Sequence, residues 1–406
     1  MRVAMVSEHA SPLARLGSRD AGGQNVHVAG LATAMGRLGA EVVVYTRRDC
    51  PTLPARVMLA PGVWVQHVDA GPALPVARDD MFPWMTEFAA RLASLWTIDP
   101  PDIIHAHFWM SGYAAITAAR GLSIPVIQTF HALGSVKQRH QGEADSSPLE
   151  RLAVERMILA AADHVIATCS DEVGELVGLN ADRQRMSVVP CGVDLSLFAP
   201  DGPLEPRRPG WFRLASVGRL VERKGVADVI AALTHLPHTE LVVAGGGEAA
   251  TSGADVERHR LAAVARRHGV EDRVHFRGRI GRADVARLMR SSDAVVCVPW
   301  YEPFGIAPIE AMACGTPVVG SAVGGLLDTI IDGETGVLVP PRDAAALGAV
   351  TREILDDDVR RAAMGRAGAR RARRHYSWAR VAGMTLGVYG GIQAGRASES
   401  VEAAAR

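Results

Sequence analysis

The stretch from Ala294 to Ala313 reads AVVCVPWYEPFGIAPIEAMA and contains the repeating unit of the fold. Its first part, Ala294–Val298, is a β-branched run that predicts a buried strand. Pro308 is typical of the first turn of a helix, so a helix is expected directly after the loop. A strand that leads through a short loop into a helix predicts a parallel sheet with helices on both faces.

The same unit recurs over almost the whole chain, in two series separated by Phe198–Trp211, which is rich in Pro, Gly and Arg. We therefore predict an α/β protein of two Rossmann-like, doubly wound domains that face each other across a cleft. The expected parts are an N-terminal domain (1–198), a linker (199–211), a C-terminal domain (212–374) and a disordered tail (394–406).

The composition limits the classes of function. The 406 residues carry 44 basic and 44 acidic side chains, and 48% of them are hydrophobic, which excludes a largely disordered chain. A net charge of zero argues against a nucleic-acid partner held by bulk charge. Only Lys137 and Lys224 among the basic residues are lysines, so each is a candidate for a role that needs a compact ammonium group.

The cysteines and the apolar runs bear on the compartment. Five widely spaced cysteines predict reduced thiols rather than a disulfide framework or a zinc site. No apolar run is long enough to span a bilayer, and the first residues lack the pattern of a signal peptide. The sequence thus predicts a cytoplasmic protein without a transmembrane segment.

Two loops with glycines or cations follow predicted strands and precede predicted helices. Gly22 and Gly23 lie in the run Asp20–His27, which either binds an anion at a helix N-terminus or forms a plain tight turn. This run is not the Gly-x-Gly-x-x-Gly fingerprint of dinucleotide sites. Arg219 and Lys224 bracket the second loop, and two cations beside a helix N-terminus suit a diphosphate.

Two carboxylates belong to the opening stretch. Glu302 lies in the loop after the strand and Glu310 lies on the helix. Both are expected at the ligand-binding edge of the sheet, and carboxylates are good acceptors for sugar and ribose hydroxyls. Phe304 and Gly305 could offer backbone N–H groups there. Acidic residues are common in first helical turns, but the Pro-Phe-Gly between these two favours a binding site.

Histidines gather at two further strand ends. His105 and His107 share one face of a strand, where two histidines can bind a metal. No partnered carboxylate or cysteine lies near them in the sequence, so no metal site is predicted. His131 follows the next strand, where catalytic groups gather in this architecture, although a single histidine is often only structural.

These motifs together resemble the family 4 glycosyltransferases, which have the two-Rossmann GT-B fold. The resemblance runs from Met1 to about Trp378, and the block Glu302–Thr335 is its most specific part. It implies that the N-terminal domain binds the acceptor, that the C-terminal domain binds a nucleotide sugar, and that residues 375–393 form a helix that crosses back to the N-terminal domain. It also implies a homodimer.

The resemblance implies roles for the candidate residues. Cations at the diphosphate would stabilise the leaving group in place of a metal, so no cofactor and no metal are expected. The catalytic residues would be His131, Arg219, Lys224 and Glu302. The donor would be bound by Gly22, Gly23, Arg219, Lys224, Arg279, Ile280, Glu302, Phe304, Gly305 and Glu310. Among these, Glu310 would hold the ribose hydroxyls, and Arg279 and Ile280 would lie near the base.

The N-terminal half is most similar to the actinobacterial D-inositol-3-phosphate N-acetylglucosaminyltransferases of mycothiol synthesis, and sucrose-phosphate synthases share several features. Two hydroxyls of the inositol-phosphate pattern are absent here, because Phe108 and Ala132 stand where a tyrosine and a threonine are expected. A phosphate dianion needs paired oxygens, so the pattern favours another acceptor, either phosphorylated differently and bound by Lys137 and Arg139, or neutral. The acceptor would lie against Asn25, Arg78, Phe108, Lys137 and Arg151.

The sequence therefore predicts a retaining, metal-independent enzyme that moves a sugar from a UDP- or GDP-linked donor to a small soluble acceptor. Same-face attack needs no enzymic nucleophile, unlike the paired carboxylates of glycosidases. A neutral natural product of an antibiotic pathway is a second candidate for the acceptor. The motifs are also compatible with a nucleotide-sugar epimerase or hydrolase, with a binding protein that lacks catalysis, and with a mannosyltransferase that has a lipid acceptor.

Overall fold

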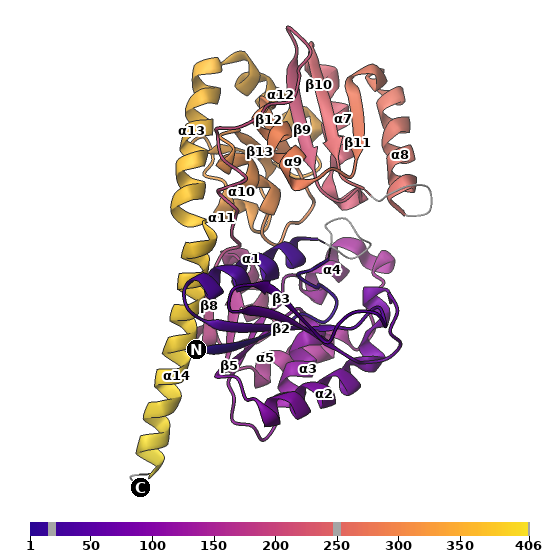
Figure 1. The fold of residues 1–406 in the computed structure, drawn as a ribbon. Helices are drawn as coiled ribbons and strands as arrows, with labels where there is room; N and C mark the ends of the chain where they lie inside the picture. The colour runs from indigo at the N-terminus through magenta and orange to yellow at the C-terminus, as the bar shows by residue number, and fades with distance from the viewer. Residues whose placement is uncertain (15–21, 247–252, 405–406) are drawn as a thin grey trace. The chain divides into compact units, whose positions relative to one another are not determined.

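The computed structural model describes residues 1–14, 22–246 and 253–404. The chain divides into two compact units, each built on one sheet (Figure 1). Of the described residues, 1–14, 22–190 and 378–404 form the N-terminal unit, and 191–246 and 253–377 form the C-terminal unit. Asp20 and Ala21, the first residues of the predicted glycine loop, lie outside the described part.

The N-terminal unit has an eight-stranded sheet in the order β3-β4-β2-β1-β5-β6-β7-β8. Its strands are β1 (Arg2–Val6), β2 (Glu41–Arg47), β3 (Arg56–Ala60), β4 (Val63–Val68), β5 (Ile103–His107), β6 (Val126–Thr129), β7 (His164–Ala167) and β8 (Met186–Val188). Its helices are α1 (Gly23–Arg37), α2 (Met85–Ile98), α3 (Trp109–Ala119), α4 (Gly134–Gln141), α5 (Arg151–Ala161), α6 (Ser170–Gly178) and α14 (Trp378–Ala404). Helices α1 and α14 cover one face of the sheet, and α2, α3 and α5 lie on the other (Figure 1).

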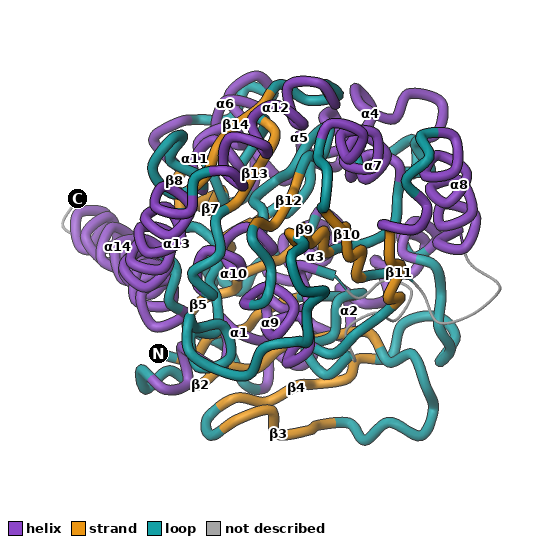
Figure 2. Tube along the Cα trace, turned by 90° about the horizontal axis from the view of Figure 1, so that it is seen from above, coloured by secondary structure: helices purple, strands orange, loops and turns teal. Residues whose placement is uncertain are grey.

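The strand β3 was not predicted from the sequence. It pairs antiparallel with β4 at the edge of an otherwise parallel sheet (Figure 2). Its residues are at most half-buried, and Met58 is 59% exposed. An edge strand of this kind buries too little apolar surface to produce the continuous hydrophobic run that marks a central parallel strand.

The C-terminal unit has a parallel six-stranded sheet in the order β11-β10-β9-β12-β13-β14. Its strands are β9 (Phe212–Val217), β10 (Thr239–Ala244), β11 (Val274–Gly278), β12 (Ala294–Cys297), β13 (Val318–Ser321) and β14 (Gly336–Val339). Its helices are α7 (Val226–Ala232), α8 (Gly253–Arg267), α9 (Arg282–Arg290), α10 (Ile306–Ala313), α11 (Leu326–Thr329), α12 (Ala344–Asp356) and α13 (Asp358–His375). The core between the sheet and α7, α8 and α12 is almost entirely aliphatic.

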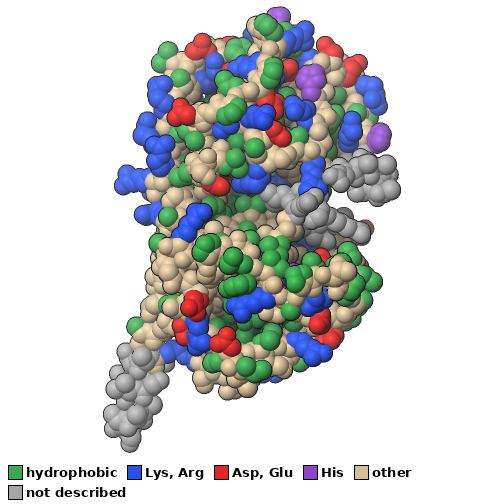
Figure 3. All heavy atoms as spheres, in the orientation of Figure 1, with side chains coloured by type: hydrophobic (Ala, Val, Ile, Leu, Met, Phe, Trp, Pro, Cys, Tyr) green, Lys and Arg blue, Asp and Glu red, His purple; other side chains and the backbone are tan. Residues whose placement is uncertain are grey.

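Helix α13 carries most of its arginines on the outside. Small residues form its inner face, and a Cβ on Gly365 would lie 2.0 Å from the Gly315 carbonyl oxygen, so the helix packs closely beside α10. Exposed arginines follow the opposite face and form part of the row of basic groups at the upper left of Figure 3. Among the described residues, no helix combines the length and apolar composition needed to cross a membrane.

The C-terminal helix α14 packs against α1 within the N-terminal unit. In α1 the buried residues Val28, Leu31 and Met35 recur at helical spacing, which explains why this stretch folds as an amphipathic helix. The indole ring of Trp378 packs directly on Gly30 of α1. A Cβ on Gly30 would lie 2.2 Å from this ring, so only glycine leaves room for it. Buried Tyr389 continues this contact along α14.

Two parts of the predicted domain plan differ from the structure. Residues 199–211, predicted as a linker, contain no helix or strand, but they group with the C-terminal unit, where Arg290 Nε donates to the Pro203 carbonyl (3.1 Å). Residues 394–404, predicted as a disordered tail, continue α14 as a helix. Alanine is the commonest residue in this segment, which also contains two glutamates, and both residue types favour a helix. Residues 405–406 lie outside the described part.

Candidate functional site

The strand order of each sheet reverses at one strand, and the candidate residues lie beside it. In the N-terminal unit β1 lies between β2 and β5, and in the C-terminal unit β9 lies between β10 and β12. At such a switch point the loops on either side run in opposite directions and leave a crevice at the carboxyl ends of the strands. The loops after β1, β5, β9 and β12 contain seven of the sixteen predicted site residues: Gly22, Phe108, Arg219, Lys224, Glu302, Phe304 and Gly305.

In the C-terminal unit, the loop after β9 carries Arg219 and Lys224. It ends in a turn at Gly225, whose φ of 68° is in the left-handed region that favours glycine. A Cβ on Gly225 would lie 2.1 Å from the carbonyl oxygen of Val298. Only glycine therefore lets the loop after β9 approach the loop after β12, which brings Lys224 beside Glu302.

The ammonium of Lys224 is hydrogen-bonded to Oε2 of Glu302, and both side chains are largely buried. Burial by itself raises the pKa of Glu302, but Lys224 and Arg223, with a smaller effect of Arg219, outweigh it and hold this pKa below the ordinary value. The carboxylate thus stays ionised at neutral pH, and the loop concentrates three cations at the carboxyl ends of β9 and β12.

Two glycines, Gly324 and Gly325, pack against the backbone carbonyl of Glu302. Gly325 N donates to the Glu302 carbonyl (2.8 Å), and a Cβ on Gly324 would lie 2.2 Å from that carbonyl oxygen. Gly305, with a φ of 94°, is the N-cap of α10, so its neighbour Phe304 lies where the helix presents unpaired N–H groups. This placement is compatible with the predicted backbone contacts of Phe304 and Gly305.

Glu310 lies one turn into α10 and is 5% exposed. Its Oε1 lies 2.8 Å from Nη2 of Arg282, the first residue of α9. Burial raises the pKa of Glu310, and the nearby Arg282 only partly opposes this. Arg279 and Ile280 occupy the loop before α9, which therefore lies beside Glu310 within this unit.

In the N-terminal unit, α1 begins at Gly23, with Gly22 as its N-cap. Asn25 is buried, and its amide is occupied locally: Oδ1 accepts from Gly22 N (2.9 Å) and Nδ2 donates to the Ser11 carbonyl (2.9 Å). This side chain ties the start of α1 to the segment after β1. Its predicted contact with the acceptor stays a prediction.

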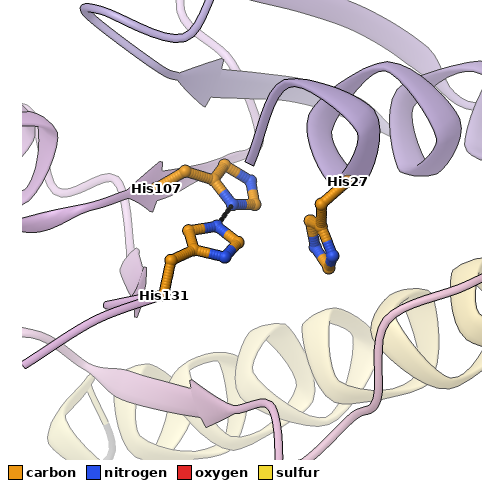
Figure 4. Close-up of side chains that lie close together, drawn as sticks. All are labelled: His27, His107 and His131. Atoms are coloured by element: carbon orange, nitrogen blue, oxygen red, sulfur yellow. Dashed lines mark hydrogen bonds between the residues drawn. The ribbon is translucent and has the colours of Figure 1, made fainter. Parts of the chain in front are cut away.

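Four histidines form a buried cluster at the carboxyl ends of β5 and β6. His107 Nδ1 lies 3.0 Å from His131 Nε2, and the ring of His27 lies beside both (Figure 4). His105 packs against His107, with ring centroids 4.1 Å apart. Burial lowers the pKa of His27 to about 4 and that of His105 to about 3, and it lowers the pKa values of His107 and His131 well below the ordinary value.

The backbones of His131 and Phe108 have unusual conformations. His131 has a φ of 60°, and Phe108 has a φ of 83° with a ψ of 159°, a combination otherwise almost restricted to glycine. The backbone of Phe108 is held on both sides, because its N–H donates to the Thr129 carbonyl (2.8 Å) and its carbonyl accepts from Gln128 Nε2 (3.1 Å). Strain of this kind concentrates at functional sites.

The predicted acceptor residues other than Asn25 do come together. The guanidinium groups of Arg78 and Arg151 lie 5.7 Å and 5.2 Å from the centroid of the buried Phe108 ring. Each cation also forms an ion pair with a carboxylate. Arg78 pairs with Asp79 (2.8 Å), and Arg151 pairs with Glu155 (2.8 Å). Lys137 pairs with Asp145 (2.8 Å) and also lies 3.4 Å from Asp79. Arg139 pairs instead with Glu175 on α6. The cluster is therefore close to electrically neutral.

Sequence reasoning missed the residues that balance or position the predicted ones. Arg282 pairs with Glu310 across 28 residues, and Asp79 pairs with Lys137 across 58 residues, so neither pair leaves a local signal. His27 was part of the quoted glycine run but was not singled out. A histidine on the buried side of α1, one turn after the start of the helix and close to a His-x-His strand, is the signal that could have found it.

Known proteins are similar to both halves of the chain. Residues 21–197 match the family model "Glycosyltransferase Family 4", and residues 207–371 match "Glycosyl transferases group 1". The D-inositol 3-phosphate glycosyltransferase of Xylanimonas cellulosilytica is 37% identical over 96% of both chains. That of Streptomyces avermitilis is 36% identical over 96% of this chain and 87% of its own.

Solved structures agree with this assignment. The sucrose-phosphate synthase of Thermosynechococcus elongatus has a TM-score of 0.89 and 32% identity, and the match covers 97% of this chain and 99% of that one. The Anabaena protein HepE, solved with UDP and glucose, has a TM-score of 0.74 at 19% identity over 96% of this chain and 99% of its own, which supports the fold alone. The chain therefore belongs to the family 4 glycosyltransferases and is a GT-B enzyme that acts on nucleotide-sugar donors.

Proposed function

We propose that the enzyme transfers a sugar with retention of anomeric configuration and without a metal, from a UDP- or GDP-linked donor to a small neutral acceptor. The observation that carries the proposal is the Lys224–Glu302 ion pair beside Arg219, at the carboxyl ends of β9 and β12. In the transition state the departing nucleoside diphosphate gains negative charge, and preorganised cations stabilise it as a metal would.

The proposed chemistry needs no nucleophile from the protein. The bond between the anomeric carbon and the diphosphate oxygen breaks, the bond to the acceptor oxygen forms on the same face, and the departing phosphate takes the acceptor proton. Lys224 pairs with Glu302, and Arg282 pairs with Glu310. Each carboxylate is thereby held in place within the C-terminal unit. His131, in its strained conformation, is proposed to contact the donor sugar.

The neutral acceptor is proposed from the charges around Phe108. A phosphate placed there would have to compete with Asp79, Asp145 and Glu155 for their cations, and it would find no hydroxyl on Phe108 or Ala132. Hydroxyl groups of a neutral polyol, in contrast, can donate to these carboxylates and accept from the same cations without separating any ion pair.

Inositol 3-phosphate is the second candidate, favoured by the names of the relatives at 36–37% identity. One experiment separates the two. Release of nucleoside diphosphate would be measured with each donor in the presence of myo-inositol, other neutral polyols or inositol 3-phosphate. Faster release with a neutral polyol is expected, whereas a strong preference for inositol 3-phosphate would overturn the neutral-acceptor proposal.

The donor and the mechanism are tested separately. Thermal shifts with UDP, GDP, ADP and dTDP should single out one nucleotide, and EDTA should not reduce its effect. The anomeric proton of the product, observed by NMR before mutarotation or further reaction, should show the configuration of the donor. An inverted product, or a turnover that EDTA abolishes, would refute retention or metal independence respectively.

A further inference from the structure

Three histidines from different elements of the N-terminal unit converge on one point (Figure 4). His27 lies on α1, His107 is the last residue of β5 and His131 follows β6. One ring nitrogen from each lies within 4.8 Å of the others. Within the described ranges, this is the only group of three or more His, Cys, Asp or Glu side chains whose ligand atoms gather so closely.

We propose that His27, His107 and His131 form a binding site for a divalent transition-metal ion such as Zn²⁺, and that the bound ion inhibits glycosyl transfer. The inhibitory effect rests on the proposed function, in which His131 contacts the donor sugar. The binding of the metal does not depend on it.

Two of the three ligand nitrogens already lie near the separation that a tetrahedral metal requires. His107 Nδ1 and His131 Nε2 are 3.0 Å apart, and two nitrogens on tetrahedral Zn²⁺ at 2.0–2.1 Å lie roughly 3.3 Å apart. A metal can therefore replace the proton that these two nitrogens share with a small outward movement of the rings. The ring of His27 is inclined at 74° to that of His131 and at 57° to that of His107, so it approaches from a different direction.

The second nitrogen of His107 supports the same inference. His107 is fully buried, and its Nε2 has no hydrogen-bond partner within the described structure. A buried ring nitrogen is almost always paired, so a fully buried imidazole with an unused nitrogen needs an explanation. The imidazole of His107 therefore has a proton or a lone pair that its described protein neighbours do not satisfy.

The donor set selects the kind of metal. Among the described residues, the group consists of three imidazoles and no carboxylate, which suits Zn²⁺, Co²⁺, Ni²⁺ or Cu²⁺ rather than Mg²⁺ or Ca²⁺. Three histidines leave one tetrahedral position for water.

Neighbouring groups hold the ligand rings in place. His105 packs on His107 and is itself fixed by Tyr389 (2.6 Å) and Thr129 (2.9 Å). Trp378 lies edge-on to His27, with centroids 5.7 Å apart. Partners of this kind orient metal ligands and raise affinity. His131 is the one ligand ring of the three whose side chain is partly exposed.

The binding test uses Co²⁺, whose visible absorption reports tetrahedral coordination without any assay of activity. Titration of the metal-free full chain should give one saturable band that Zn²⁺ abolishes. His27→Phe keeps an aromatic ring between its neighbours and should weaken Co²⁺ binding at least about tenfold. His268→Phe, at an exposed histidine of the C-terminal unit, is the matched control and should bind as the wild type does.

Two results would overturn the metal site: the absence of a saturable band, or equal Co²⁺ affinity in the wild type and His27→Phe. Circular dichroism must show that the variant is folded, and His27→Gln replaces it if the phenylalanine is not accommodated.

The inhibition is tested by turnover. Zn²⁺ should reduce the wild-type rate, EDTA should restore it, and His27→Phe should keep its rate in Zn²⁺, since His27 is outside the proposed catalytic set. Full activity of the Zn²⁺-loaded wild type would refute inhibition. If no donor and acceptor gave turnover, the proposed function would fail, and the Co²⁺ titration would still decide the metal site.

Discussion

The carboxylate of Glu302 holds the ammonium of Lys224 across 78 residues of sequence. The contact joins the loops after β9 and β12, on the two sides of the point where the strand order reverses. One of only two lysines in the chain is found here, and its ammonium is a compact charge, unlike the planar guanidinium of arginine.

Lys224→Ala should abolish most of the turnover while leaving the fold intact. The leaving diphosphate loses one of its preorganised cations, and removal of a single such group costs about 10²–10³ in kcat. Steady-state kinetics would be compared with those of Arg258→Ala, an exposed arginine on α8, which should behave as the wild type. A normal rate in Lys224→Ala would remove Lys224 from the diphosphate site.

Glu310→Gln should weaken the binding of the nucleoside diphosphate without preventing folding. The side chain keeps its shape but loses the charge that accepts the ribose hydroxyls, and hydrogen bonds to charged groups contribute about 1.5–3 kcal/mol, so an affinity loss of roughly 10- to 100-fold is expected. Calorimetric titration with the preferred nucleotide would measure it. An unchanged affinity would contradict the ribose role.

The stabilising effect of Glu302 should disappear in acid. The pKa of Glu302 in the folded protein is below its ordinary value of 4.5, so the contribution is fully present above about that pH and is lost as the pH falls through the lower, folded-state pKa. Urea unfolding of the wild type and Lys224→Ala over a range of pH values should show a difference that shrinks in acid. A difference that is constant or grows in acid would contradict the ion pair.

Tyr389→Phe should destabilise the N-terminal unit. Thr129 Oγ1 donates to the Ile166 carbonyl, so it accepts from His105 Nε2, and His105 Nδ1 must then accept from the Tyr389 hydroxyl. Removing that hydroxyl leaves a buried acceptor unpaired, which costs about 1–3 kcal/mol. Chemical denaturation would measure the loss, with Tyr113→Phe as the control at a more exposed hydroxyl. Equal stability of both variants would refute the inferred tautomer.

Cys50 should be the thiol that reacts first with iodoacetamide in the native protein. Hydrogen bonds from Thr52 lower the pKa of Cys50, whereas burial raises the pKa of Cys297 to about 12 and that of Cys314 to about 12. Mass spectrometry at neutral pH should find one rapid adduct, absent in Cys50→Ser. Early labelling of Cys297 would mean that the Lys224–Glu302 region opens in solution.

Much of the candidate site was accessible from the sequence because its signals are local. The Glu302-x7-Glu310 spacing, the Arg219–Lys224 loop and the strand-to-helix alternation each depend on residues close in the chain. Hydrophobic runs and helix-starting residues then specify two doubly wound sheets, since strand and helix periods follow from backbone geometry. The edge strand β3 was missed because its residues are at most half-buried, and the helical end of α14 was missed because the sequence after Ala394 has no periodic pattern of apolar residues.

The sequence by itself determined the class of fold, the family and the cationic loop of the C-terminal unit. Only the tertiary structure decided which charges are matched and which histidines meet. Asp79 and Asp145 neutralise Lys137, and α1 brings His27 to His107 and His131. These contacts exist because packing joins elements that are far apart in the chain. Desolvation then shifts the pKa values of the buried side chains.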